Sequence, residues 1–179
     1  PATIPVVTRT QESRHPMPAF RPFALALFVA VLPIPAAAQS TLNTVQRGFL
    51  PLSSSTGLRD VDGFRIGSAR FAVVCRGSAG VDIVSTQNPA ALSVTAHLVS
   101  AGGDAVDAAT QGTALYVAHT TGGVTVVDVS APAAPVVVTT LPPSGENLFV
   151  AEGFLYVARG TSGGGELLTY DLAAPLAPQ

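Results

Sequence analysis

A serine inside a glycine-rich pentapeptide is the first candidate for chemistry in this sequence. Gly160–Gly164 reads GTSGG and fits G-x-S-x-G, the pattern of a nucleophile elbow. That elbow needs a strand-to-helix turn, and an acid and a histidine later in the chain that activate the serine. No histidine follows Ser162, and the segment lies between two predicted strands. We therefore interpret it as a glycine-rich hairpin and predict no catalytic residue.

Metal and cofactor sites are equally hard to assemble from the sequence. Asp60–Gly63 reads DVDG and shares letters with calcium loops, but the later ligands are missing. His97 and His119 have no cysteine or second histidine at ligand spacing, and His97 is most simply a strand residue at a sheet edge. The single Cys75 ends the apolar run FAVVC, so we predict a buried, inert thiol. The sequence thus predicts no metal and no cofactor.

The elements that would position any site belong to a repeat. The sequence GGVTVVDVSAPAAP at Gly122–Pro135 returns as GELLTYDLAAPLAP at Gly165–Pro178, and a weaker copy stands at Gly80–Leu92. Successive copies lie 43 residues apart. The motif LYVA at Leu115–Ala118 recurs at Leu155–Ala158, 40 residues on, because the last glycine-rich loop is three residues longer. Self-similarity at a fixed period of this length indicates a repeat fold.

Each copy resolves into four short apolar runs separated by turn residues. These runs are rich in Val, Thr and Tyr and bounded by Gly and Pro, which is typical of strands. Four strands in about 40 residues form the unit of a β-propeller blade, whose two apolar faces are buried by stacking. We predict an all-β fold of four-stranded antiparallel blades, in an incomplete propeller of about three. The predicted strands of the central copy are Ala105–Ala109, Ala114–His119, Val124–Val129 and Val136–Leu141, and the predicted blades are about 58–101, 102–145 and 146–179.

Aspartate and proline mark the turn after the third strand of each copy. An aspartate at the end of that strand can accept a hydrogen bond from the backbone N–H two residues on and start the turn. The prolines that follow fix φ and withhold a donor, so one stops the strand and the next opens the outer strand. The first copy has Ser85 and Leu92 instead of the aspartate and the second proline, so we expect its turn to be set less firmly. The residues that we expect to shape the repeat are Asp128, Asp171, Pro89, Pro132, Pro175, Pro135, Pro178, Tyr116 and Tyr156.

The central copy, LYVAHTTGGVTVVDVSAPAAPVVV, resembles an LVIVD repeat, a propeller-forming repeat of exported bacterial proteins. An aromatic strand, a glycine-rich hairpin, a Val-rich strand ending in Asp and a proline-spaced turn carry the resemblance, which covers about residues 58–179. It implies a β-propeller in a secreted or surface setting, and it implies no reaction. Propellers use about four to eight blades, so either the chain is truncated or it associates with other copies. We favour a partial chain, because the sequence stops within a repeat.

Charged residues at the strand ends are the candidates for ligand contact. When the copies are aligned on the aromatic strand, Arg76, His119 and Arg159 occupy equivalent positions at the entry to a hairpin. We expect the connections between blades, which carry acidic residues, on the same face. The simpler interpretation is a set of solvated loop residues with weak ion pairs. The functional hypothesis is an arc of charge that reads carboxylates or phosphates of a polymer or partner. The acidic residues are Asp60, Asp104 and Glu146.

Composition limits the choice of partners. The 179 residues are 47% hydrophobic and 11% charged, with a formal net charge of −2 and no lysine. Nucleic-acid binding needs clustered cations, so we predict no nucleic-acid partner. One cysteine excludes an internal disulfide framework. The partner that we expect is a protein or polymer that the sequence does not identify.

The first 57 residues are predicted to lie outside the repeats. From Met17 the sequence gives an arginine, the ten-residue apolar run Phe23–Leu32, two prolines and Ala36–Ala38. That layout is typical of a secretory signal peptide, 17–38, and the apolar run is too short to span a bilayer. We predict cleavage after Ala38, no stable membrane span afterwards, and a secreted, periplasmic or cell-surface product. Residues 1–16 are predicted to be a non-structural upstream extension, and 39–57 a linker and lead-in.

Two classes of function remain open at this point. The first is an exported, non-catalytic β-propeller that acts as a binding or protein-interaction scaffold. The second is the N-terminal fragment of a secreted propeller enzyme whose catalytic residues lie in missing blades or an appended domain. A propeller can serve either purpose, so the fold does not decide. We favour the first because the loops of this chain are short and poor in acid–base groups.

Overall fold

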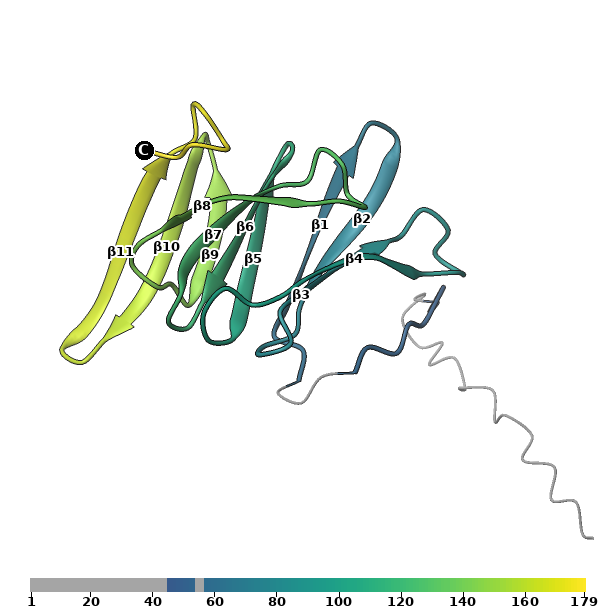
Figure 1. The fold of residues 1–179 in the computed structure, drawn as a ribbon, viewed down its shortest axis with the longest axis horizontal. Coiled ribbons are helices and arrows are strands. Elements are labelled where there is room, and N and C mark those ends of the chain that lie inside the picture. The colour runs from purple at the N-terminus through teal and green to yellow at the C-terminus, as the bar shows by residue number, and fades with distance from the viewer. Residues whose placement is uncertain (1–44, 54–56) are drawn as a thin grey trace, which may run out of the picture. The chain divides into compact units, whose positions relative to one another are not determined.

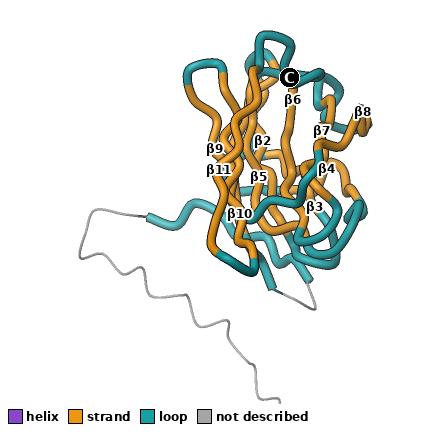
Figure 2. Tube along the Cα trace, turned by 90° about the vertical axis from the view of Figure 1, so that its left-hand side faces the viewer, coloured by secondary structure: helices purple, strands orange, loops and turns teal. Residues whose placement is uncertain are grey.

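Short Val-rich runs between Gly and Pro turns form strands throughout the part of the chain that can be described. The structure is a computed structural model, and it describes residues 45–53 and 57–179. All of these residues belong to one compact unit. The predicted upstream extension, the signal peptide with its cleavage site, and the first part of the linker lie outside the described residues. Figure 2 draws strands and loops but no helix in the described part.

The strands form three antiparallel sheets, which follow one another along the chain (Figure 1). The first and second sheets have four strands each and the third has three, in an order that follows the chain from β1 to β4, β5 to β8 and β9 to β11. The predicted all-β fold of antiparallel blades is thereby confirmed. The bounds are β1 Asp60–Ile66, β2 Ala69–Cys75, β3 Val81–Ser85, β4 Ser93–Leu98, β5 Ala105–Gln111, β6 Ala114–His119, β7 Gly123–Asp128, β8 Val136–Leu141, β9 Asn147–Ala151, β10 Phe154–Thr161 and β11 Gly164–Asp171.

The turn after the third strand repeats with the period of the sequence. Asp128 accepts a hydrogen bond from the Ser130 N–H at 2.8 Å, and Asp171 accepts one from Ala173 at 2.7 Å. These are the predicted Asp turns. In the first copy, where Ser85 replaces the aspartate, the side chain of Asn88 accepts from Ala90 at 3.1 Å instead. Asn88, three residues after Ser85, thus takes the turn-forming role that the aspartate has in the other two copies.

Gln179 pairs with the outer edge of the third sheet as the first residue of β8 pairs with the second sheet. Val136, directly after Pro135, opens β8 opposite Asp128. Gln179 takes the same place opposite Asp171, with backbone hydrogen bonds of 2.8 and 3.1 Å. The outer edge of β11 carries no fourth strand in the described structure.

Two apolar clusters fill the spaces between the sheets. Strand side chains alternate between the two faces of a sheet, so a sheet with apolar residues at successive positions can bury both of its faces. Val73 and Ile83 of the first sheet pack with Leu115 and Val117 of the second. The opposite face of the second sheet, which includes Tyr116, packs on the third sheet. The first strands of successive sheets, β1, β5 and β9, are neighbours. No helix in the described ranges is long and apolar enough to cross a membrane.

Candidate functional site

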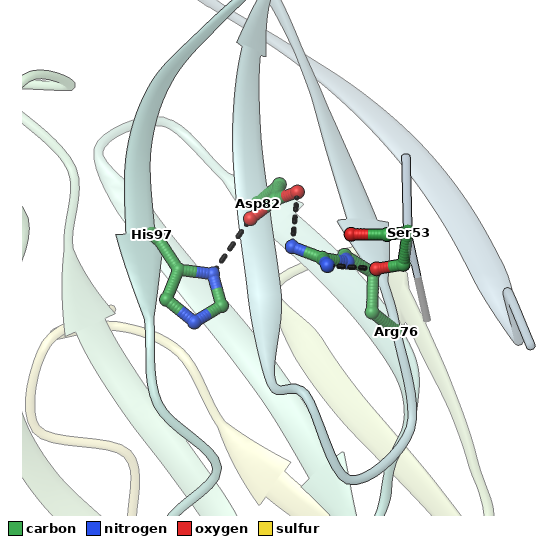
Figure 3. A network of polar contacts seen from close by, with 4 residues as sticks. All are labelled: Ser53, Arg76, Asp82 and His97. Carbon is green, nitrogen blue, oxygen red and sulfur yellow. Dashed lines mark hydrogen bonds and ion pairs between the residues drawn. The ribbon is translucent and has the colours of Figure 1, made fainter. Parts of the chain in front are cut away.

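A buried carboxylate on the first sheet organises a network of polar contacts. Asp82 is the second residue of β3, and its side chain is 2% exposed. Arg76, just after β2, donates from Nη1 to one carboxylate oxygen at 2.7 Å. His97 on β4 places Nδ1 2.6 Å from the other oxygen (Figure 3). Two charge-assisted contacts thus offset the cost of burying the carboxylate.

The same network holds the segment before the first strand. The second terminal nitrogen of Arg76 donates to the backbone carbonyl of Ser53 (Figure 3). Pro51, Leu52 and Ser53 line a groove of about 520 Å³ with Asp82 and His97. Because Val81 and Ile83 point into the core between the first two sheets, the side chain of Asp82 points to the opposite, outer face of the first sheet. Segment 45–53 therefore lies over that outer face.

An imidazole bonded to a carboxylate resembles the pairs that act as general bases. We therefore compared this pair with the equivalent residues of the second sheet. Asp82 and His97 face each other across the β3–β4 ladder. The corresponding pair in the second sheet is Thr125 and Thr140, which have no acid–base function near neutral pH. The dyad is thus a property of the first sheet alone. No sheet of the described residues covers the outer face of the first sheet, and a polar face suits such a position. We interpret the network as the cap of this end.

Sequence reasoning found only part of this network. It placed Arg76 at a hairpin and His97 on an edge strand, and both positions are confirmed. It missed Asp82. The available signal was one charged residue in an otherwise apolar third strand, where the other copies have Thr125 and Leu168. The side chain's burial, which makes it important, depends on segment 45–53, whose position no local pattern predicts.

Hairpins and inter-sheet connections share one end of the sheets, as expected from the repeat. Thr120 N–H donates to the Asp104 carbonyl at 3.0 Å, and Glu146 N–H donates to the Ala158 carbonyl at 2.8 Å. The charges pair differently from the expected arc. Arg159 pairs with Glu166 across its own hairpin at 2.7 Å, and Asp104 pairs with an arginine of the preceding copy, Arg59, at 3.3 Å.

The burial of His119 differs from the expectation that this position is a solvent-exposed basic residue. His119 is 3% exposed, and burial lowers the pKa of its imidazole, which favours the neutral form. The Ser100 hydroxyl lies 3.1 Å from its Nδ1. Arg76 is also mostly buried, with 14% of its side chain exposed. Positions that are equivalent in sequence therefore differ in exposure, because a neighbouring sheet or segment covers two of the three.

A second correction concerns which acidic residues correspond. The sequence placed Asp60 and Asp104 in equivalent connections between blades, but the register pairs Asp60 with Cys75 and Asp107 with Ala118. A bulge between Ala105 and Asp107 shifts the second copy. Since Cys75 and Ala118 lie 43 residues apart in equivalent strands, Asp107 is the counterpart of Asp60.

These two aspartates connect each sheet to the next. Asp60 accepts a hydrogen bond from the Ala108 N–H at 3.1 Å, and Asp107 accepts one from the Leu148 N–H at 2.5 Å. Each carboxylate thus accepts from a backbone N–H on the first strand of the following sheet. That N–H belongs to the residue directly after the aspartate's own counterpart in the following sheet. Burial, with a contribution from Asp60, raises the pKa of Asp107 to about 6. We call this contact the inter-sheet clasp.

The repeat geometry has a counterpart among known families. The family model for the LVIVD repeat matches residues 102–141. The chain carries an LVIVD repeat. No curated protein and no solved structure matched the chain. The matched residues cover β5 to β8, so the LVIVD repeat of this chain is its second sheet, and the first and third sheets repeat its register.

The LVIVD repeat contacts the third sheet through a tyrosine. Tyr116 is fully buried, and its hydroxyl donates to the Pro175 carbonyl at 2.8 Å, in the proline turn of the following copy. Tyr170 makes a similar contact in the opposite direction, to the Pro142 carbonyl at 2.8 Å. Burial raises the pKa of Tyr116 to about 12. The aromatic position and the proline turn of the LVIVD pattern are therefore two halves of one contact between neighbouring sheets.

The outer face of the third sheet exposes large apolar side chains. Phe149 is 65% exposed and Leu167 is 68% exposed. Phe149 and Phe154 each lie with their ring centroids 6.4 Å from that of Tyr156, so the three aromatic side chains form a continuous patch. We call these four residues the third-sheet face. The positions that correspond in the LVIVD repeat are buried, and they are Ala109, Ala114, Tyr116 and Val124.

Proposed function

We propose that this protein is an exported, non-catalytic interaction scaffold and that it binds a protein partner through the third-sheet face. The observation that carries the proposal is the contrast in burial at equivalent positions. Val124 of the LVIVD repeat is 1% exposed, whereas its counterpart Leu167 is 68% exposed. Contiguous exposed apolar patches on soluble proteins mark interaction sites. The third-sheet face is such a patch on a rigid sheet.

The two ends of the stack support the same proposal by their difference. The outer face of the first sheet carries the Arg76–Asp82–His97 network and is covered by segment 45–53. The third sheet has no comparable polar network among the described hydrogen bonds and ion pairs of its outer face. This difference favours the third sheet over the first as the partner-binding surface.

Substitution of the third-sheet face tests the proposal directly. Changing Phe149→Ser together with Leu167→Ser should remove binding of a hydrophobic dye and any self-association seen by sedimentation equilibrium, because both depend on this patch. Val99→Ser with Val136→Ser is the matched control, since these valines are 82% and 59% exposed elsewhere. Equal dye binding by the two double variants would refute the proposal.

Export is the second part of the proposal, and it is supported by the layout of Met17–Ala38 and by the setting that the LVIVD resemblance implies. We expect the exported product to begin at Gln39. N-terminal sequencing of material from the culture medium, periplasm or cell surface measures this. A full-length product retained in the cytoplasm would contradict it.

A further inference from the structure

We infer that the space between the first and second sheets contains a binding site for one water molecule, formed by the Thr125 hydroxyl and the His119 imidazole. The site lies inside the stack, so the inference goes beyond the interaction scaffold and does not depend on the third-sheet face. Three observations carry it: a cavity of the right size, a buried hydroxyl without a partner, and an imidazole nitrogen that can accept a hydrogen bond.

The cavity is large enough for a single water molecule and for little else. Its volume is about 20 Å³, and about 10–15 Å³ is enough for one water molecule. The first sheet contributes Val81 and Leu98 to its walls, and the second contributes Val117. Thr125 and His119 are the two polar side chains of the lining. The size of the cavity excludes an organic ligand, and its two polar groups suit a small molecule that both donates and accepts hydrogen bonds.

Thr125 presents an unsatisfied hydroxyl to this space. It lies on β7 opposite Val117, on the face that packs against the first sheet, and it is 3% exposed. Its Oγ1 has no hydrogen-bond partner among the described residues. A buried hydroxyl without a partner is destabilising, and ordered water is a common partner of such groups. A water molecule in the cavity would supply an acceptor for this hydroxyl.

The hydrogen bonds of Ser100 decide which nitrogen of His119 can accept. The Ser100 hydroxyl donates its only proton to the Gly103 carbonyl, so its oxygen is the acceptor in the 3.1 Å contact with Nδ1 of His119. Nδ1 therefore carries the proton of the neutral ring, and Nε2 is left as an acceptor. Burial lowers the pKa of this imidazole, which favours the neutral form. A water molecule can donate to Nε2 while it accepts from Thr125.

The space between the second and third sheets has a different residue at the same place. Leu168 lies opposite Val157, as Thr125 lies opposite Val117. Leu168 packs in the apolar cluster between these two sheets, so an apolar side chain fills the position there. Threonine is shorter than leucine and carries a hydroxyl. At the equivalent place between the first and second sheets it therefore leaves room for a small polar molecule and offers it a partner.

A water molecule in this place would tie the second sheet to the connection that leads into it. Ser100 belongs to the connection between β4 and β5, and His119 is the last residue of β6. Ser100, His119, the water molecule and Thr125 would then form one hydrogen-bonded chain from this connection to β7. Water-mediated hydrogen bonds stabilise such a contact nearly as well as direct ones.

Replacement of the Thr125 hydroxyl tests the inference, because the two possible states of this group predict opposite signs. Thr125→Val keeps the shape of the side chain and removes the hydroxyl. If the hydroxyl holds a water molecule, the variant should melt about 3 °C below the wild type, because the water loses a partner. If the hydroxyl is unsatisfied, the variant should melt above the wild type, because valine is easier to bury. Differential scanning calorimetry measures the shift.

Thr140→Val is the matched control. Thr140 lies directly opposite Thr125 on β8 and is exposed, so this variant reports the effect of the same substitution in a strand without the cavity. We expect it to leave the melting temperature unchanged. A melting temperature of Thr125→Val equal to or above that of Thr140→Val would overturn the inference.

Nuclear magnetic resonance gives a direct readout in the folded, full-length chain. A bound water molecule should give a cross-peak between slowly exchanging water and the ring protons of His119, and the ¹⁵N signals of that ring should show a proton on Nδ1. Thr125→Val should lose the cross-peak, and Thr140→Val should keep it. Absence of the cross-peak in the wild type would refute the water site and would leave the interaction scaffold, which Phe149→Ser with Leu167→Ser tests, unaffected.

Discussion

At the scale of single residues, burial decides which groups can react, and Cys75 shows this. Its side chain is fully buried, and burial, with smaller contributions from Asp60 and Asp107, raises the pKa of the thiol to about 12. Since the thiolate is the reactive form, we expect no modification by a maleimide at pH 7.5 in the native protein and rapid modification in denaturant. Mass spectrometry measures the label. Native labelling as fast as that of the denatured chain would contradict the assignment.

The contribution of Asp107 to folding stability should depend on pH with the opposite sign to that of most carboxylates. Its pKa is about 6 in the folded state against an ordinary value of 3.8, so the folded state binds the proton more tightly. The stability that this gives is fully present below pH 3.8 and is lost as the pH rises through 6. We expect Asp107→Asn to remove this loss, because the amide oxygen can still accept from Leu148. Urea midpoints at pH 4, 5, 6 and 7 measure it, and parallel profiles for both proteins would refute the prediction.

At the scale of elements, the hairpin of the LVIVD repeat depends on a glycine. Gly123 has a φ of 84°, and a Cβ there would lie 2.5 Å from the Leu141 carbonyl oxygen on the neighbouring strand. Gly112 also has a positive φ, of 60°, but a Cβ would meet open space. We expect Gly123→Ala to cost about 3 kcal/mol or more and Gly112→Ala about 1 kcal/mol. Urea unfolding measures both, and equal costs would show that the strand contact does not matter.

Strands and turns were the part of the fold that the sequence predicted best. Two strands of the central copy, Ala114–His119 and Val136–Leu141, have the predicted bounds. The Asp128 turn forms as expected, because it needs only neighbouring residues. The role of Asp82 was not predicted because its burial depends on segment 45–53, which the fold brings close to it. The register of Asp107 was not predicted because a bulge in β5 shifts the alignment of the second copy with the first. Such a bulge leaves no clear local signal in the sequence.

At the scale of the whole molecule, the repeat period predicted three similar sheets but not the difference between their exposed ends. That difference comes from a few substitutions at equivalent positions. Where the LVIVD repeat has His119, Thr125 and Thr140, the first sheet has Arg76, Asp82 and His97. Alignment shows these differences, but only the packing of segment 45–53 shows that they close one end. Among residues 45–53 and 57–179 no sheet covers the outer face of β9 to β11, so the exposure of the third-sheet face also depends on packing.

Conversion of the first sheet into a copy of the second would test this view of the molecule. The triple variant Arg76→His, Asp82→Thr, His97→Thr removes the buried charge and the anchor of Ser53, and it gives the outer face of the first sheet the polar pattern that packs on a preceding sheet. We expect this face to dock on the third-sheet face of another copy. Head-to-tail contacts of this kind do not close by themselves, so the variant should form open chains whose size grows with concentration in sedimentation velocity. Adding Leu167→Ser should return the wild-type distribution. A triple variant that sediments like the wild type would show that the Arg76–Asp82–His97 network is not what closes this end.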